Sequence, residues 1–161
     1  MKNSKWALVI GIIAILGFLF IDMDSGSARS NTNNFLTHVT KENFEKAFDY
    51  LYYHNHASDE EVTISYKAAK EIWVNRVKQL KEEGTYIKSF EKLVMRPDDG
   101  WQNGYVKLTV VENGKEVIYD NVYIAFNQVD GKWKVISLQE DAQHKGKDQL
   151  WEIAYSGYVG K

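Results

Sequence analysis

The spacing of the apolar residues changes once along this chain, near Gly84, and no other feature restricts its possible folds as much. Apolar residues recur at helical spacing before Gly84 and mostly at every second position after it. Helices that precede a run of neighbouring strands pack as a layer on one face of an antiparallel sheet. The change therefore predicts an α+β fold, with helices first and a sheet of about four strands after them.

The first predicted helix covers about residues 41–53. Phe44, Phe48 and Leu51 are spaced so that they fall on one side of it. Thr40 precedes these residues and is a favoured N-cap, because its hydroxyl can accept a hydrogen bond from a free backbone N–H of the first turn. We expect this helix to pack on the sheet through its apolar side.

A second helix is predicted between Ser65, as its N-cap, and Gly84, which follows its last turn. Glycine readily adopts the left-handed conformation that ends many helices, so Gly84 marks the point where the chain leaves this one. The predicted apolar face consists of Ala69, Ile72, Trp73, Val77 and Leu80.

Four strands are predicted after this helix, over about residues 85–96, 102–111, 116–127 and 133–138. The dipeptides at 113–114 (Asn-Gly) and 130–131 (Asp-Gly) favour tight hairpin turns, so that neighbouring strands pair antiparallel. Along the third strand we expect one face to carry Ile118, Val122, Ile124 and Phe126, and the other to carry Tyr119 and Tyr123. Because both faces hold large side chains, we expect a long, curved sheet that wraps the helices.

The N-terminal segment has the pattern of an export signal or membrane anchor. Residues 6–21 are uncharged and mostly apolar, with two lysines before them and two aspartates after them. A helix of this length spans about 24 Å, against about 30 Å for the hydrocarbon core, and Lys5 and Trp6 can extend it at the interface. The lysines are expected to stay inside, which places the rest of the chain outside the cell membrane.

These patterns divide the chain into three parts. We predict a signal-anchor or signal peptide over 1–28, a polar linker over 29–36, and an extracytoplasmic α+β domain over 37–161. Residues 26–28 (Gly-Ser-Ala) fit the small-residue pattern that signal peptidase accepts. Secretion after cleavage near Ala28 is therefore the alternative to a retained single-pass anchor.

Composition excludes several classes of function. The formal net charge is −2, and a chain this close to neutral lacks the basic surface that nucleic-acid binding needs. The chain contains no cysteine, which excludes disulfides, thiolate metal sites and thiol catalysis. The predicted domain must therefore be stabilised by its own core.

A family resemblance rests on the order of the elements and on the closing strand. Two helices and a strand meander that ends in Asp-Gly-Lys-Trp-Lys-Val (130–135) resemble the nuclear-transport-factor-2-like superfamily over about residues 40–139. The resemblance implies a cone-like arrangement of the sheet around the helices. Members with an N-terminal membrane helix include components of conjugation and secretion channels. By this resemblance the chain is a non-catalytic binding or assembly module, with envelope proteins or further copies of itself as partners.

The same resemblance implies an alternative function. The cone of this superfamily can open into an apolar pocket, so a carrier or sensor of a small apolar ligand is the second hypothesis. The candidate pocket residues are Tyr50, Tyr53, Trp73, Tyr105 and Tyr123. No cofactor is predicted.

Few residues are candidates for chemistry. His54 and His56 lie close together before three acidic residues, but no third ligand is obvious, so we predict a polar loop and no metal site. Some members of the superfamily place an Asp in the cone for proton transfer. Here Asp49 lies on the side of the predicted helix opposite Phe44 and is expected to face water. We therefore predict that the chain is not an enzyme.

The last predicted feature is an aromatic C-terminal segment. Large side chains cluster at Leu150, Trp151, Ile153, Tyr155 and Tyr158. We expect this segment to dock on the domain as a short helix or strand, since large free aromatic patches are rare on soluble domains. An exposed tail that binds a partner or the membrane surface is the alternative.

Overall fold

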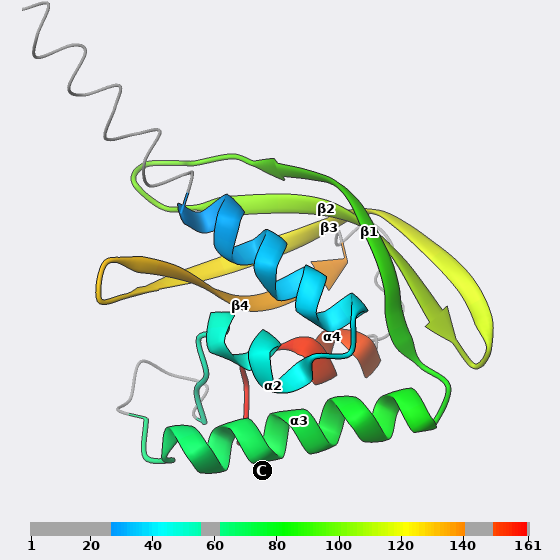
Figure 1. Ribbon diagram of the computed structural model, residues 1–161. Coiled ribbons are helices and arrows are strands. Elements are labelled where there is room, and N and C mark those ends of the chain that lie inside the picture. The colour runs from blue at the N-terminus through cyan, green and yellow to red at the C-terminus, as the bar shows by residue number, and fades with distance from the viewer. Residues whose placement is uncertain (1–26, 56–61, 141–149, 161) are drawn as a thin grey trace, which may run out of the picture.

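The computed structural model describes residues 27–55, 62–140 and 150–160, and these form helices packed on one four-stranded antiparallel sheet (Figure 1). The strands are β1 (Tyr86–Met95), β2 (Asn103–Glu112), β3 (Lys115–Val129) and β4 (Lys132–Glu140), and they pair in chain order as an open sheet. The predicted α+β fold and strand meander are confirmed. Residues 6–21, the predicted anchor, lie outside the described residues.

A helix over residues 27–40 precedes all the predicted elements, so the prediction of a polar linker over 29–36 is wrong. The buried residues of this helix are spaced as one helical face. They comprise Ala28, Thr32, Phe35, Leu36 and Val39. The intervening polar residues lower the mean hydropathy and make the segment resemble a linker, although every third or fourth position faces the core. The folded domain therefore begins before residue 37.

The predicted helix over 41–53 is also wrong in its extent. Thr40 belongs to the last turn of the helix over 27–40, and its hydroxyl donates to the Leu36 carbonyl at 3.0 Å. Glu42 has a left-handed φ of 60°, which breaks the helix there. Two short elements follow, α2 (Phe44–Ala47) and the 3₁₀ helix η1 (Phe48–Tyr50). Leu51 is already extended and forms a bridge with Val135 in β4.

Helix α3 (Tyr66–Glu82) forms where the sequence predicts it. The Ser65 hydroxyl caps its first turn by accepting from the Ala68 N–H at 3.3 Å, and Gly84 follows it with a left-handed φ of 88°. Trp73 and Val77 are fully buried. Ile72 is 42% exposed and is therefore not part of the apolar face to which the sequence assigned it.

The sheet is curved, and β-bulges account for much of its bending. Pairing shifts by one residue at two places between β1 and β2, at one between β2 and β3, and at one between β3 and β4. A bulge bends its strand and increases the local twist. Figure 1 shows the resulting long strands bending around the helix over 27–40.

One bulge changes which side chains of β3 face the core. Val106 pairs with Val122 but Leu108 pairs with Tyr119, so two residues of β3 oppose Lys107 alone. Tyr119 is buried as a result, whereas Ile118 is 58% exposed. The prediction that placed Ile118 on the same face as Val122, and Tyr119 on the opposite face, is wrong, because it assumed unbroken alternation along the strand.

The C-terminal segment docks on the domain, as predicted. Helix α4 (Leu150–Tyr155) buries Trp151 and Tyr155. After the helix, the Gly157 N–H donates to the Ile136 carbonyl at 2.7 Å. A Cβ atom at Gly157 would lie 1.8 Å from the Tyr52 carbonyl oxygen, so only glycine fits here without a backbone shift. The predicted alternative of an exposed aromatic tail does not hold for residues 150–160.

Candidate interaction surface

Two of the predicted pocket residues, Tyr105 and Tyr123, form a pair on the outer face of the sheet. They are cross-strand partners in β2 and β3, with ring centroids 5.6 Å apart at an interplanar angle of 63°. Their neighbours Val106 and Ile124 are buried in the core, so the two tyrosines point to the opposite face. Both are half-buried, which leaves part of each ring available for contact.

Polar groups hold this pair in place from two sides. The Tyr123 hydroxyl donates to Asn103 Oδ1 at 2.6 Å, and the Arg96 guanidinium lies 5.1 Å from the centroid of the Tyr105 ring. Burial, with a smaller effect of the neighbouring Tyr105, raises the pKa of Tyr123, so its hydroxyl stays protonated as a donor. Val94 of β1 pairs with Tyr105 and is itself exposed. We call Val94, Arg96, Asn103, Tyr105 and Tyr123 the outer tyrosine surface.

Trp101 adds a second exposed aromatic group on the turn between β1 and β2. It is 59% exposed, and its ring meets the buried Trp133 edge to face at 6.1 Å between centroids. Asp98 and Trp101 exchange backbone hydrogen bonds of 2.9 and 2.8 Å, which fix the turn. Tryptophan, tyrosine and arginine are the residue types most often found at the energetic centres of protein interfaces.

The other three predicted pocket residues lie on the helix side of the sheet and do not meet the tyrosine pair. Trp73 is fully buried, between the rings of Phe35, Phe48 and Tyr155 at 5.8–6.3 Å. Tyr50 stacks on His38, and Tyr53 packs on Phe48. The five residues therefore do not line one common cavity.

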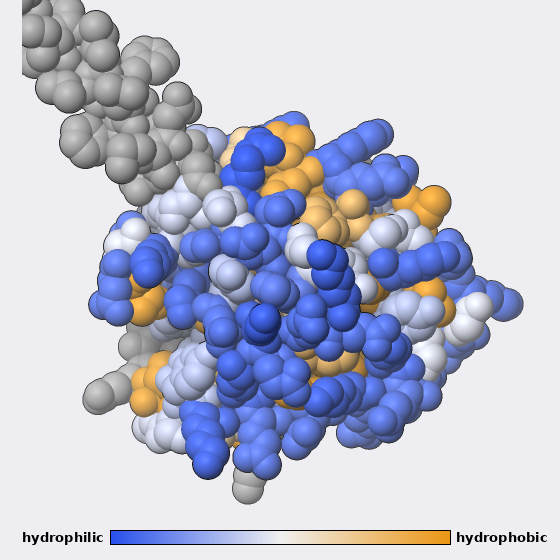
Figure 2. Space-filling view, in the orientation of Figure 1, coloured by the Kyte–Doolittle hydropathy of each residue, from blue (hydrophilic) through white to orange (hydrophobic). Residues whose placement is uncertain are grey.

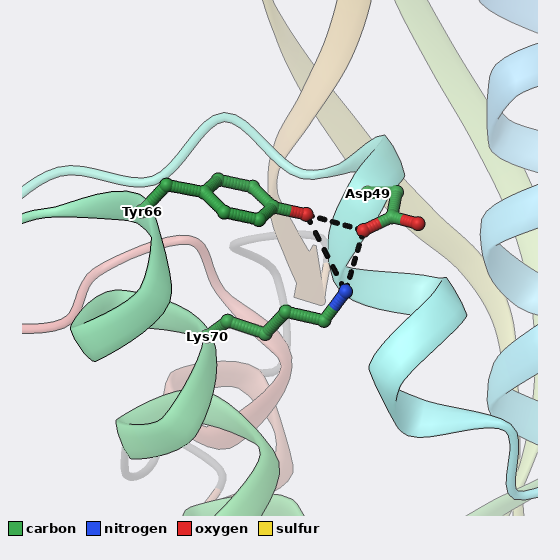
Figure 3. A network of polar contacts seen from close by, with 3 residues as sticks. All are labelled: Asp49, Tyr66 and Lys70. Atoms are coloured by element: carbon green, nitrogen blue, oxygen red, sulfur yellow. Dashed lines mark hydrogen bonds and ion pairs between the residues drawn. The ribbon is translucent and has the colours of Figure 1, made fainter.

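A polar cluster joins η1 to α3 (Figure 3). Lys70 Nζ donates to Asp49 Oδ1 at 2.8 Å, and the Tyr66 hydroxyl donates to the same oxygen. Burial disfavours the ionised carboxyl, but these two hydrogen bonds outweigh it and lower the pKa of Asp49. The pKa of Tyr66 is raised by burial and by Asp49. The carboxylate is thus held ionised, and it is half exposed, which suits an ion pair better than a proton-transferring base.

Asp49 and Tyr50 also border a surface hollow of about 290 Å³ beside the β3–β4 turn. Asn31, Asp130 and Lys132 line its other walls. The mixture of charges shows no arrangement that selects one kind of ligand. The expectation that Asp49 faces water agrees with its exposure.

The histidines hold no metal site within the described part of the chain. His54 lies in an extended segment, where its N–H donates to the Gly157 carbonyl at 2.9 Å and its carbonyl accepts from the Val159 N–H at 2.7 Å. Across residues 27–55, 62–140 and 150–160, no group of three potential ligands is close enough to hold a metal ion. His56 and His144 lie outside the described residues.

The sequence reasoning missed Arg76, which fixes the C-terminal segment. Its guanidinium donates to three backbone carbonyls, those of Ala154 (3.1 Å), Ser156 (2.9 Å) and Tyr158 (2.6 Å). Burial lowers the pKa of Arg76 to about 10. The carbonyls at the end of a helix carry partial negative charge, so a cation is well placed there. Arg76 follows Trp73 on α3, and Trp73 Nε1 also donates to Ser156 at 3.0 Å.

The sequence reasoning also missed Arg96 and Asn103, which complete the outer tyrosine surface. Both lie at the ends of the connection between β1 and β2, where polar residues are common and carry little information by themselves. Comparison with known proteins found no matching family model, no matching curated protein and no matching solved structure. None of the helices in the described residues has the length and apolar character needed to cross a membrane.

Proposed function

We propose that this chain is a non-catalytic binding or assembly module, held at the cell membrane by residues 6–21 with its domain outside, and that the outer tyrosine surface is where it contacts a protein partner. The partner is an envelope protein or another copy of the chain. The observation that carries the proposal is the Tyr105–Tyr123 pair, half-buried beside Arg96 on the face of the sheet opposite the buried residues Val106 and Ile124.

The chemistry of this surface supports protein binding. The aromatic rings offer apolar area at a small cost in conformational entropy, and Arg96 and Asn103 offer hydrogen bonds around them. The polar contacts that already hold the rings reduce the ordering needed on binding. Helices followed by a four-strand meander are also what the nuclear-transport-factor-2-like resemblance implies, and this supports the assembly role.

Removing the two rings tests the proposal. The full chain should be produced in its host cells and extracted from membranes in mild detergent, with the complex size measured by native electrophoresis. We expect the unaltered chain to migrate as a complex, and the variant Tyr105→Ala/Tyr123→Ala to migrate mainly as a monomer. The matched control is Tyr52→Ala/Tyr158→Ala, which removes two tyrosines from the C-terminal side of the domain.

Two results would contradict the proposal. A complex that keeps its size in the Tyr105→Ala/Tyr123→Ala variant would exclude this surface as the contact. A chain recovered entirely in the soluble fraction, with residues 6–21 intact, would exclude the membrane-anchored role.

A further inference from the structure

A hollow of about 470 Å³ lies between the helix over 27–40 and strand β1. One wall carries Arg29, Ser30 and Asn33, and the other is formed by residues 90–93 of β1. Arg29 spans the two walls, because its Nη1 donates to the Leu93 carbonyl at 3.1 Å. Figure 2 shows an apolar area (orange) between the start of this helix and β1. The hollow therefore combines two cations, Arg29 and Lys92, with an apolar floor.

A bulge in β1 shapes the second wall. Lys92 and Leu93 together oppose Val106 of β2, and Lys92 has a left-handed φ of 53°. β1 is an edge strand, and bulges at sheet edges change the direction in which side chains point. Lys92 is exposed, whereas Phe90 and Leu93 are partly buried against the core. The bulge thus places a cation directly beside two apolar side chains on an outer rim.

The hollow lies close in the chain to the predicted membrane segment. Only residues 22–26 separate the predicted membrane segment, which ends at Ile21, from residue 27, the first residue that the structure describes and already part of the helix over 27–40. Five residues span at most about 18 Å even when fully extended. Arg29 follows residue 27 by two positions. If residues 6–21 are in the bilayer, the hollow must lie close to the membrane surface.

We propose that this hollow is a membrane-contact site, in which Arg29 and Lys92 bind phospholipid phosphates and Phe90 and Leu93 rest against the boundary between headgroups and acyl chains. The inference depends on the proposed anchoring by residues 6–21. Arginine and lysine near a membrane bind phosphate oxygens, and aromatic and aliphatic side chains settle at the same depth. The contact fixes the orientation of the domain, so that the partner surface points in a defined direction.

The charges nearby limit the lipid selectivity. Glu91 also lines the hollow and is exposed, and its negative charge offsets part of the positive charge of Arg29 and Lys92. Asp22 and Asp24 precede residue 27 in the sequence and oppose an acidic membrane. Each basic residue near an acidic surface contributes about 1 kcal/mol, and the acidic residues offset part of this. We therefore expect contact with both zwitterionic and acidic lipids, with a small preference for acidic ones.

The absence of cysteine allows a direct test with single labelled positions in the full chain. Asn33→Cys places a fluorophore in the hollow, and Lys67→Cys places one on α3, on the side of the domain away from the start of the first helix (Figure 1). Each variant is labelled with an environment-sensitive dye and reconstituted into phosphatidylcholine vesicles, with and without phosphatidylglycerol. Carbonate extraction first establishes that the chain is inserted.

The expected result is a blue-shifted emission at position 33, with at least twofold stronger quenching by a lipid-borne quencher than at position 67. Adding Arg29→Ala/Lys92→Ala should reduce the quenching at position 33 by about half. The matched control, Lys115→Ala/Lys132→Ala, removes the same charge from the exposed first residues of β3 and β4 and should leave the quenching unchanged.

The outcomes separate the two proposals. A chain that carbonate extracts is not anchored, and the proposed function then fails together with this inference. An inserted chain whose two positions are equally quenched, or equally unquenched, overturns the membrane-contact site alone. Loss of quenching in the Lys115→Ala/Lys132→Ala control would also overturn it, because the contact would then follow total charge and not the hollow.

Discussion

The two faces of the sheet differ in how completely their aromatic side chains are packed by other residues. On the inner side, where the helices pack, Trp73 of α3 is surrounded by other rings, and the C-terminal segment is held by hydrogen bonds from Arg76. On the outer face, Tyr105 and Tyr123 contact each other and two polar residues, and no described helix covers them. Both faces are aromatic, but only the inner one is packed on all sides.

This difference separates stability from function. Burial of the inner rings accounts for much of the free energy of folding that a domain without disulfides needs. The outer rings add little to that and remain available for a partner. Substitutions on the two faces should therefore have opposite effects: large on stability inside, and large on binding outside.

The largest effect is expected for Trp73→Ala. This change removes a fully buried ring and its hydrogen bond to the Ser156 carbonyl. We expect the free energy of unfolding to fall by about 4 kcal/mol, as measured by urea denaturation. Trp101→Ala is the matched exposed control, with an expected loss of less than about 1 kcal/mol. Equal losses in the two variants would show that the inner face is not the stabilising one.

The next effect in size is expected for Arg76→Leu. The change leaves the carbonyls of Ala154 and Tyr158 without their guanidinium donors, and burying an unpaired carbonyl costs about 1 to 3 kcal/mol. We expect a loss of about 2 to 3 kcal/mol in the free energy of unfolding, and faster hydrogen exchange at the Gly157 and Val159 amides. Exchange that is unchanged there would contradict the role assigned to Arg76.

A smaller effect is expected from alkaline pH through Tyr119. Burial, together with its hydrogen bond of 2.5 Å to Glu112, raises the pKa of Tyr119 to about 12. The unfolded chain loses this proton near pH 10, whereas the folded chain keeps it. Stability should therefore be fully present below about pH 10 and fall between about pH 10 and 12.

The variant Tyr119→Phe separates this residue from the other tyrosines. Burial also raises the pKa of Tyr155, so part of the alkaline loss should remain. The expected result is a shallower fall of the free energy of unfolding between about pH 10 and 12, measured by urea denaturation at several pH values. An unchanged slope would show that Tyr119 ionises equally in both states.

The smallest effect on stability is expected for Tyr105→Ala. The ring contacts with Tyr123 and Arg96 are half-exposed, and such contacts contribute about 0.5 to 1 kcal/mol each. We expect a loss of about 1 kcal/mol, measured by urea denaturation, beside a large loss of partner binding. A stability loss as large as that of Trp73→Ala would remove the distinction between the two faces.

The sequence predicts the elements better than the face of the sheet on which each residue lies. α3 and the four strands follow from local signals, such as the Ser65 cap and the Asn113–Gly114 turn. Continued regularly from that turn, the register would pair Tyr105 with Val122. The bulge opposite Lys107 shifts the partner to Tyr123. No local pattern marks this bulge, so the tyrosine pair could not be predicted.

The helix over 27–40 was missed for a different reason. Its polar residues outnumber its apolar ones near the start, and its apolar face is defined only by the sheet that it packs on. Arg76 likewise has no signal in the sequence, because its three partners are backbone carbonyls about 80 residues later. Long-range contacts of this kind carry no residue-type signature.

The most direct test of the account is photo-cross-linking from the outer tyrosine surface. A photoreactive amino acid is placed at position 105 of the full chain in its host cells, and at position 67 on α3 as the control. We predict one discrete cross-linked species at position 105, lost in the Arg96→Ala background, and none at position 67. No product at position 105, or the same products at both positions, would contradict the claim that this surface binds a partner.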